Sequence, residues 1–112
     1  MEEPLPFDAL ELSFELIECL RKPVQVIQAR DKDLARQIRR DACSIALKLA
    51  AGRERIGGDR LQLFRTTHGS AKELRAPLRV ARSWGSVAEG GLGASEARLD
   101  RICAICWKLT HG

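Results

Sequence analysis

Five basic residues between positions 65 and 82 recur at helical spacing and are able to bind anions. Their separations are 7, 3, 4 and 3 residues, and each directly follows an apolar position, so all five share one flank of a helix. They are Arg65, Lys72, Arg75, Arg79 and Arg82. An arginine guanidinium suits planar, bidentate contact with carboxylate or phosphate. The stripe therefore predicts a polyanion-binding surface, a set of ion pairs with acidic side chains, or a contact with an acidic protein.

Charge is unevenly distributed along the rest of the chain. The net charge is +4, but residues 1–20 hold six acids and no base, while the remaining residues hold all 19 Lys and Arg. Further candidates for nucleic-acid binding outside the stripe are Arg36, Arg39, Arg40, Arg53 and Arg55. Three of the early acids recur at steps of 4 and 3 and are candidate partners of the stripe, within one chain or between subunits: Glu11, Glu15 and Glu18.

Aromatic residues, at 4% of the chain, are too scarce to favour recognition of single strands by base stacking. Contact with the backbone of a duplex or a structured RNA needs only cations, and the sequence supplies those. We therefore expect any nucleic-acid contact to be electrostatic and independent of base sequence.

Nothing in the chain predicts a catalytic centre, a metal site or a cofactor site. Cys103 and Cys106 form a CxxC pair, but a structural zinc site needs two more ligands at suitable spacing. His68 falls on the apolar side of its predicted helix, where a hydrogen-bonded core histidine is the simpler expectation. The glycine-rich segment 52–59 matches no phosphate-loop pattern and is expected to be a plain interhelical loop.

The composition favours an all-α fold, because Ala, Leu, Arg and Glu dominate and tyrosine is absent. The length of 112 residues suits one domain, with residues 1–8 as a short N-terminal tail. Four apolar stripes of helical period predict an antiparallel, up-down-up-down four-helix bundle. No stretch has the length of a transmembrane span or the pattern of a signal peptide, so we expect a cytoplasmic protein with reduced cysteines.

Polar residues near the starts of the stripes predict where the helices begin. The expected caps are Asp8 for the first helix, Asp31 or Asp33 for the second, Asp59 for the third and Ser95 for the fourth. Gly52 is expected to end the second helix, and Trp84-Gly85 the third.

Two residues of the third helix are unusual in a helix interior. Gly69, beside Ser70, predicts close approach of a neighbouring helix, with Phe64 and Ile45 as further packing residues. Pro77 predicts either one kinked helix or a break near Ala76; the continuing apolar register favours the kinked helix.

Two segments resemble a known four-helix-bundle family: "QIRRDACSIALKLAAG" at 37–52 and "GGDRLQLFRTTHGSAKELRAPLRVARSWG" at 57–85. The family includes proteins encoded in intervening sequences of bacterial 23S rRNA genes, also called S23 ribosomal proteins. It also includes the accessory variability determinant of diversity-generating retroelements. Lys48 and Ala51 depart from the family pattern, which commonly has Asn and Glu there, and Pro77 is also unusual.

The resemblance implies an antiparallel bundle that assembles into a homopentamer. For the retroelement branch it implies a basic surface that engages a reverse transcriptase and nucleic acid. The modest net charge of +4 favours the broad family over that branch. The leading hypothesis is thus a non-enzymatic, oligomeric adaptor that binds RNA, DNA or a ribonucleoprotein. The alternative is a structural or protein-binding ring whose bases form subunit salt bridges.

Overall fold

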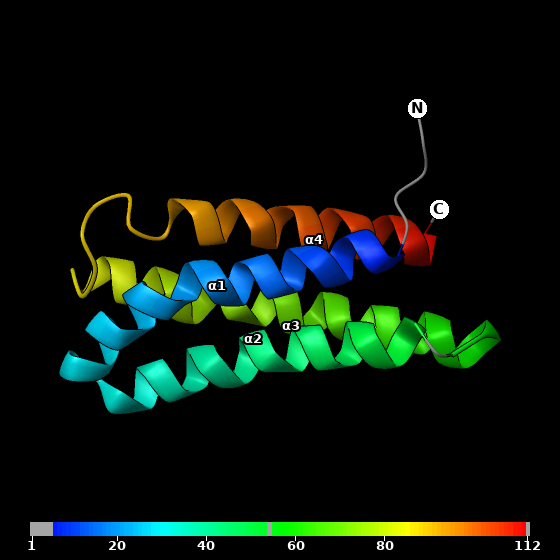
Figure 1. Cartoon of the computed structure of the whole chain (residues 1–112), viewed down its shortest axis with the longest axis horizontal. Helices are drawn as coiled ribbons and strands as arrows, with labels where there is room; N and C mark the ends of the chain where they lie inside the picture. Colours follow the sequence, from blue (N-terminus) through cyan, green and yellow to red (C-terminus); the bar gives the residue numbers. More distant parts are fainter. Residues whose placement is uncertain (1–5, 54, 112) are drawn as a thin grey trace.

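The apolar stripes form four helices. The computed structural model describes residues 6–53 and 55–111. Its elements are α1 (Pro6–Arg30), α2 (Lys32–Arg53), α3 (Gly57–Ser83) and α4 (Gly93–His111) (Figure 1). No strand occurs within the described ranges, so the predicted all-α bundle is confirmed. The expected tail at 1–8 is shorter, because α1 begins at Pro6; residues 1–5 lie outside the described part of the chain.

Each helix runs back along the one before it, and α4 closes the bundle against α1 (Figure 1). The packed pairs are α1 with α2, α2 with α3, α3 with α4, and α1 with α4. As a result, α1 and α3 lie diagonally across the bundle from each other. This order decides which charged faces can meet within one chain.

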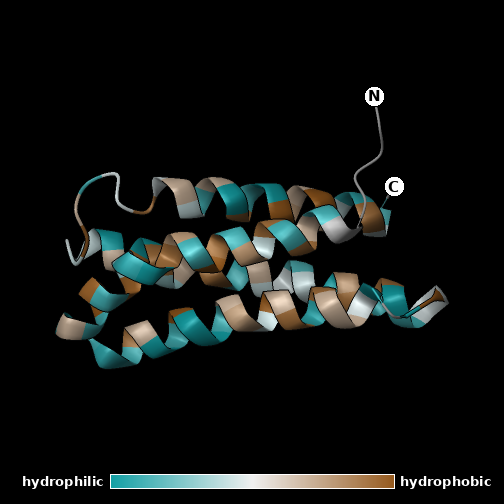
Figure 2. Cartoon of the chain, in the orientation of Figure 1, coloured by the Kyte–Doolittle hydropathy of each residue, from teal (hydrophilic) through white to brown (hydrophobic). Residues whose placement is uncertain are grey.

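The core is built from the predicted stripes of all four helices. Leu16, Ile45, Leu74 and Ile102 are fully buried, and Phe64 is almost so, which confirms Ile45 and Phe64 as packing residues. Hydrophobic and hydrophilic positions alternate along each ribbon in Figure 2, as expected for helices that bury one side. Burial of these apolar side chains is the main force holding the bundle together.

Helix starts were predicted less well than helix faces. Asp31 is the single residue between α1 and α2, and its Oδ1 accepts a 3.0 Å hydrogen bond from the Leu34 backbone N–H, so Asp31 is the cap. The prediction for Asp59 was wrong. Helix α3 begins at Gly57, and the N-cap position is Ile56, which makes no side-chain cap. Gly57 has φ 64°, a conformation open to glycine, and so admits an earlier entry to the helix.

The prediction that Ser95 caps α4 was also wrong. Helix α4 begins two residues earlier, at Gly93, so Ser95 falls inside the first turn. Its side chain is buried there, and its Oγ has no hydrogen-bond partner among the described residues. At the end of α3, Gly85 has φ 70° directly after the C-cap residue Trp84, which confirms the predicted stop. Helix α2 ends at Arg53, one residue after the expected Gly52.

Pro77 lies inside α3, which continues from Gly57 to Ser83, so the alternative of a break near Ala76 is excluded. The prediction for Gly69 was wrong within the chain. Gly69 is exposed, and a Cβ built on it would meet nothing within 4 Å. The small residue that a neighbour does approach is Ser70, which is buried against α2.

Candidate nucleic-acid interface

Three exposed cations on α3 form a regular row, which we call the α3 cation row: Arg65, Lys72 and Arg79. Successive members are seven residues apart, a rise of about 10.5 Å with almost no rotation around the helix. None of the three forms an ion pair within the described residues. The row therefore presents uncompensated positive charge along about 21 Å of one helix flank.

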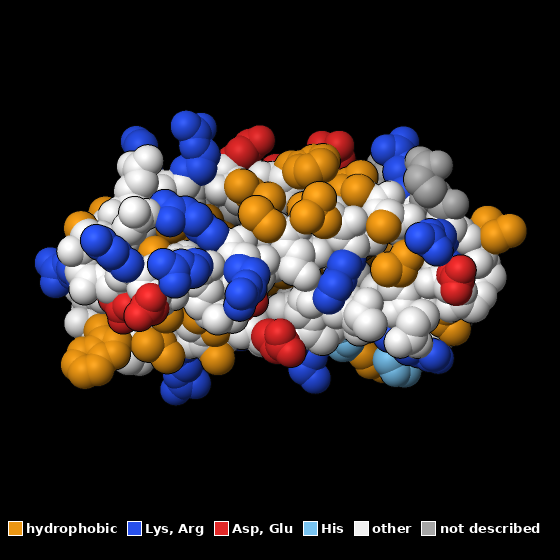
Figure 3. Space-filling model, turned by 90° about the horizontal axis from the view of Figure 1, so that it is seen from below, with side chains coloured by type: hydrophobic (Ala, Val, Ile, Leu, Met, Phe, Trp, Pro, Cys, Tyr) orange, Lys and Arg blue, Asp and Glu red, His pale blue; other side chains and the backbone are white. Residues whose placement is uncertain are grey.

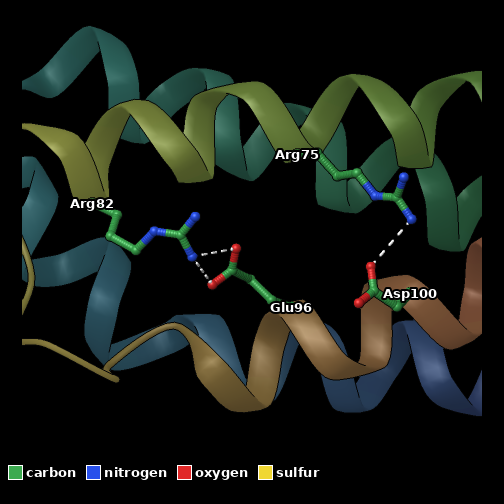
Figure 4. Close-up of polar contacts among 4 residues, drawn as sticks. All are labelled: Arg75, Arg82, Glu96 and Asp100. Atoms are coloured by element: carbon green, nitrogen blue, oxygen red, sulfur yellow. Dashed lines mark hydrogen bonds and ion pairs between the residues drawn. The ribbon is translucent and has the colours of Figure 1, made fainter.

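The other two cations of the predicted stripe are paired with carboxylates of α4 (Figure 4). Arg75 Nη2 lies 3.1 Å from Asp100 Oδ1. Arg82 Nη1 donates to both carboxylate oxygens of Glu96, at 2.6 and 2.8 Å. These pairs bridge the groove between α3 and α4, and exposed pairs of this kind stabilise a fold by less than about 1 kcal/mol. Their main effect is to fix which cations of α3 remain free.

The groove between the two helices contains a cavity of about 210 Å³. Arg79 lines it together with the paired Arg75 and Arg82, over a floor that includes Leu78 and Leu99. The two pairs leave further N–H donors of both guanidinium groups unused by Glu96 and Asp100. Glu96 and Asp100 also line this cavity, so an anion there would meet carboxylates as well as guanidinium groups.

The acids of α1 do not face the stripe within the chain. Glu15 Oε1 instead accepts a 3.1 Å hydrogen bond from Arg98 Nε on α4. Glu11 and Glu18 are exposed and form no ion pair among the described residues. The prediction that these acids neutralise α3 was therefore wrong for a single chain, because α1 lies diagonally opposite α3. Pairing between subunits remains a prediction.

The five basic residues predicted outside α3 do not extend its row. Arg39 lines a cavity between α1 and α2, and Arg40 lines one between α2 and α3. Arg36 lies 3.5 Å from Asp33, and Arg55 lies 3.5 Å from Asp59. Arg53 is exposed at the end of α2. Figure 3 shows Lys and Arg spread over the face seen from below, interrupted by hydrophobic and acidic side chains. The ten predicted residues thus occupy several surfaces rather than one patch.

A polar contact joins α2 to α3. Lys48 Nζ donates a 2.8 Å hydrogen bond to Ser70 Oγ. Ser70 is buried, so its hydroxyl needs a hydrogen-bond partner, and Lys48 supplies it. This contact confirms Ser70 as a packing residue, for a polar reason.

Burial shifts the pKa values of two cysteines and of His68. Burial raises the pKa of Cys106 to about 12, and burial also raises the pKa of Cys103, so both thiols resist ionisation. Burial, followed by the charges of Lys72, His111 and Arg75, lowers the pKa of His68. Among the residues that the structure describes, no three His, Cys, Asp or Glu side chains gather as metal ligands would.

One feature was missed by the sequence reasoning. The Trp107 and His111 rings are stacked, with centroids 4.5 Å apart and an interplanar angle of 10°. The available signal was their spacing of four residues in the last predicted helix, which places two rings on one helix face. The low aromatic content of the whole chain gives no sign of this local pair.

The chain matches no protein-family model, and no curated protein or solved structure is significantly similar to it. Within the described part of the chain, no helix combines the length and apolarity that crossing a bilayer requires.

Proposed function

We propose that this chain is a non-enzymatic, oligomeric adaptor of the cytoplasm that binds nucleic acid or a ribonucleoprotein through the α3 cation row. The observation that carries this proposal is the exposure of Arg65, Lys72 and Arg79 without ion-pair partners, at intervals of seven residues. The flanking cations Arg75 and Arg82 are occupied by α4. The regular, unneutralised row suits a ligand with regularly repeated negative charge.

Phosphate backbones match these properties. Duplex DNA carries one negative charge per roughly 1.7 Å of its axis. The cations of the α3 cation row are about 10.5 Å apart, so a phosphate group lies within reach of each of them. Gly69 lies between Arg65 and Lys72 on the same flank. Because glycine has no side chain, nothing projects from the helix surface between these two cations. A phosphate backbone is able to approach α3 closely there.

The resemblance to the 23S rRNA intervening-sequence family supports an oligomeric protein, with a homopentamer as the expected assembly. It also supports a partner that is itself bound to nucleic acid, such as a reverse transcriptase. The bundle fold is compatible with both, because it leaves the outer faces of the helices available for contacts with other molecules.

A second candidate function is a structural or protein-binding ring in which the row forms salt bridges between subunits. The observation that favours it is the exposure of Glu11 and Glu18 without ion pairs, on a helix that cannot reach α3 of its own chain. An α1 helix of one subunit is able to supply these carboxylates to α3 of another.

The two functions are separated by replacing Arg65, Lys72 and Arg79 together with Gln. The matched control replaces three other exposed cations with Gln and so lowers the net charge by the same amount. These cations are Lys22, Arg30 and Arg101. Retention of the variants by immobilised duplex RNA and their mass by light scattering are measured in parallel.

Nucleic-acid binding predicts that the α3 variant loses retention while its mass and the control's retention are unchanged. Use of the row in subunit salt bridges predicts a lower mass for the α3 variant alone. Equal retention of both variants at unchanged mass would contradict both functions.

A further inference from the structure

The stacked pair on α4 leaves aromatic surface open to solvent. His111 covers one face of the Trp107 indole, with ring centroids 4.5 Å apart, yet 52% of Trp107 remains exposed. About half of Trp107 is thus available for contact with another molecule.

The histidine ring is held in position by its own helix. His111 Nδ1 lies 2.9 Å from the Trp107 carbonyl oxygen and 2.9 Å from Thr110 Oγ1. Both contacts are made by Nδ1, so Nε2 has no hydrogen-bond partner among the described residues and is left for an outside partner. Rings that are fixed before binding lose little conformational freedom when a ligand arrives.

The pair lies beside the middle of the α3 cation row. Trp107 lies seven residues after Asp100 and so on the same side of α4, the side that pairs with Arg75 of α3. His68 lies seven residues before Arg75 on α3, and burial, followed by the charges of Lys72, His111 and Arg75, lowers its pKa. Lys72 also acts on the thiol of Cys103, which is one helical turn before Trp107 on α4. The structure thus brings a fixed aromatic stack and an unpaired cation of the row to the same groove between α3 and α4.

We propose that Trp107 and His111 form a stacking platform for an unpaired nucleobase whose neighbouring phosphates lie on Lys72 and Arg65. Every base has a π-face, so the platform accepts bases without strong sequence preference. The preferred ligand is then a single strand, or the single-stranded end or loop of a structured RNA, rather than a continuous duplex. This inference rests on the proposed function, because the row supplies the phosphate contacts.

The chain contains its own control for the assay. Trp84 is more exposed than Trp107, at 78%, but it stacks on no ring within the described residues. A Trp84→Phe background leaves Trp107 as the only tryptophan. The single-stranded probe is a 12-nucleotide oligoadenylate RNA; the probes without unpaired bases are inorganic polyphosphate and a blunt RNA duplex of similar charge.

The platform predicts that oligoadenylate quenches Trp107 emission and that polyphosphate, at equal occupancy, does not. In the same background, Trp107→Leu weakens oligoadenylate binding about 5- to 150-fold, the range measured for loss of one stacked base. It leaves polyphosphate affinity unchanged, and Trp107→Phe restores part of the loss. Circular dichroism melts of each variant verify that the bundle is folded.

Other results overturn the inference in distinguishable ways. If Trp107→Leu lowers only the melting temperature and oligoadenylate affinity is unchanged, the stack is a helix-stabilising pair. If oligoadenylate and polyphosphate bind equally well and neither depends on Trp107, the row binds phosphate without a platform. If no probe binds, the proposed nucleic-acid function fails and the platform fails with it.

Discussion

Replacing Gly69 with Ala tests whether the flank of α3 around Gly69 is open. The quantity that reports this is the free energy of unfolding of the bundle. Gly69 lies in the interior of a 27-residue helix, and a Cβ added there would meet nothing within 4 Å. A glycine in a helix interior costs about 0.8–1 kcal/mol relative to alanine, and no clash reduces the gain. Gly69→Ala should therefore raise the free energy of unfolding by roughly 0.5–1 kcal/mol and the melting temperature by about 2–5 °C.

Gly52 is the matched control, because it lies in α2 but is buried. A Cβ at Gly52 would lie 3.2 Å from Phe64 Cε1, so the ring has to shift before Ala fits. Gly52→Ala should consequently gain much less stability than Gly69→Ala, or lose some. Urea unfolding gives both free energies, and light scattering gives the oligomer mass. A loss of stability or of mass in Gly69→Ala would show that another surface packs on Gly69, and would refute an open flank.

Three further predictions concern His68, the cysteines and Ser95. His68→Gln should lose less stability than the native chain as the pH falls from about 7.5 to 5. The reason is that the pKa of His68 is lowered below 6.5 by folding, so acid favours the unfolded, protonated form; thermal melts across pH measure this. Iodoacetamide at about pH 8 should modify the exposed Cys43 rapidly and Cys106 only after unfolding, because burial raises the pKa of Cys106 to about 12; mass spectrometry of peptides reads the sites. Ser95→Ala should stabilise the bundle by about 1 kcal/mol in urea titration, because it removes a buried hydroxyl without a partner, and a destabilised variant would imply a hidden hydrogen bond.

The fold was predictable because apolar spacing is a local property. Ile45 and Phe64 were expected to pack in the core, and both are buried. The caps predicted at Asp59 and Ser95 lie three residues past the actual N-cap positions, because α3 begins at Gly57 and α4 at Gly93.

The candidate site was predictable in part for the same reason. The flank of α3 that carries the cations follows from spacing along one helix. Which cations remain free depends on Glu96 and Asp100, which arrive from α4 across the groove. The position of the aromatic stack also depends on packing, because the Arg75–Asp100 pair turns the side of α4 that carries Trp107 toward α3. Such pairings depend on the order of the helices around the bundle, and local patterns do not contain it.

The salt dependence of duplex binding tests the central claim most directly. The logarithm of affinity falls with the logarithm of salt concentration by about 0.9 per phosphate neutralised. If Arg65, Lys72 and Arg79 each contact one phosphate, replacing all three with Gln should reduce this slope by about 2.7. The native chain should then lose about 40-fold more affinity than the variant between roughly 50 and 200 mM salt. Equal slopes for the two proteins would mean that the row does not contact phosphate.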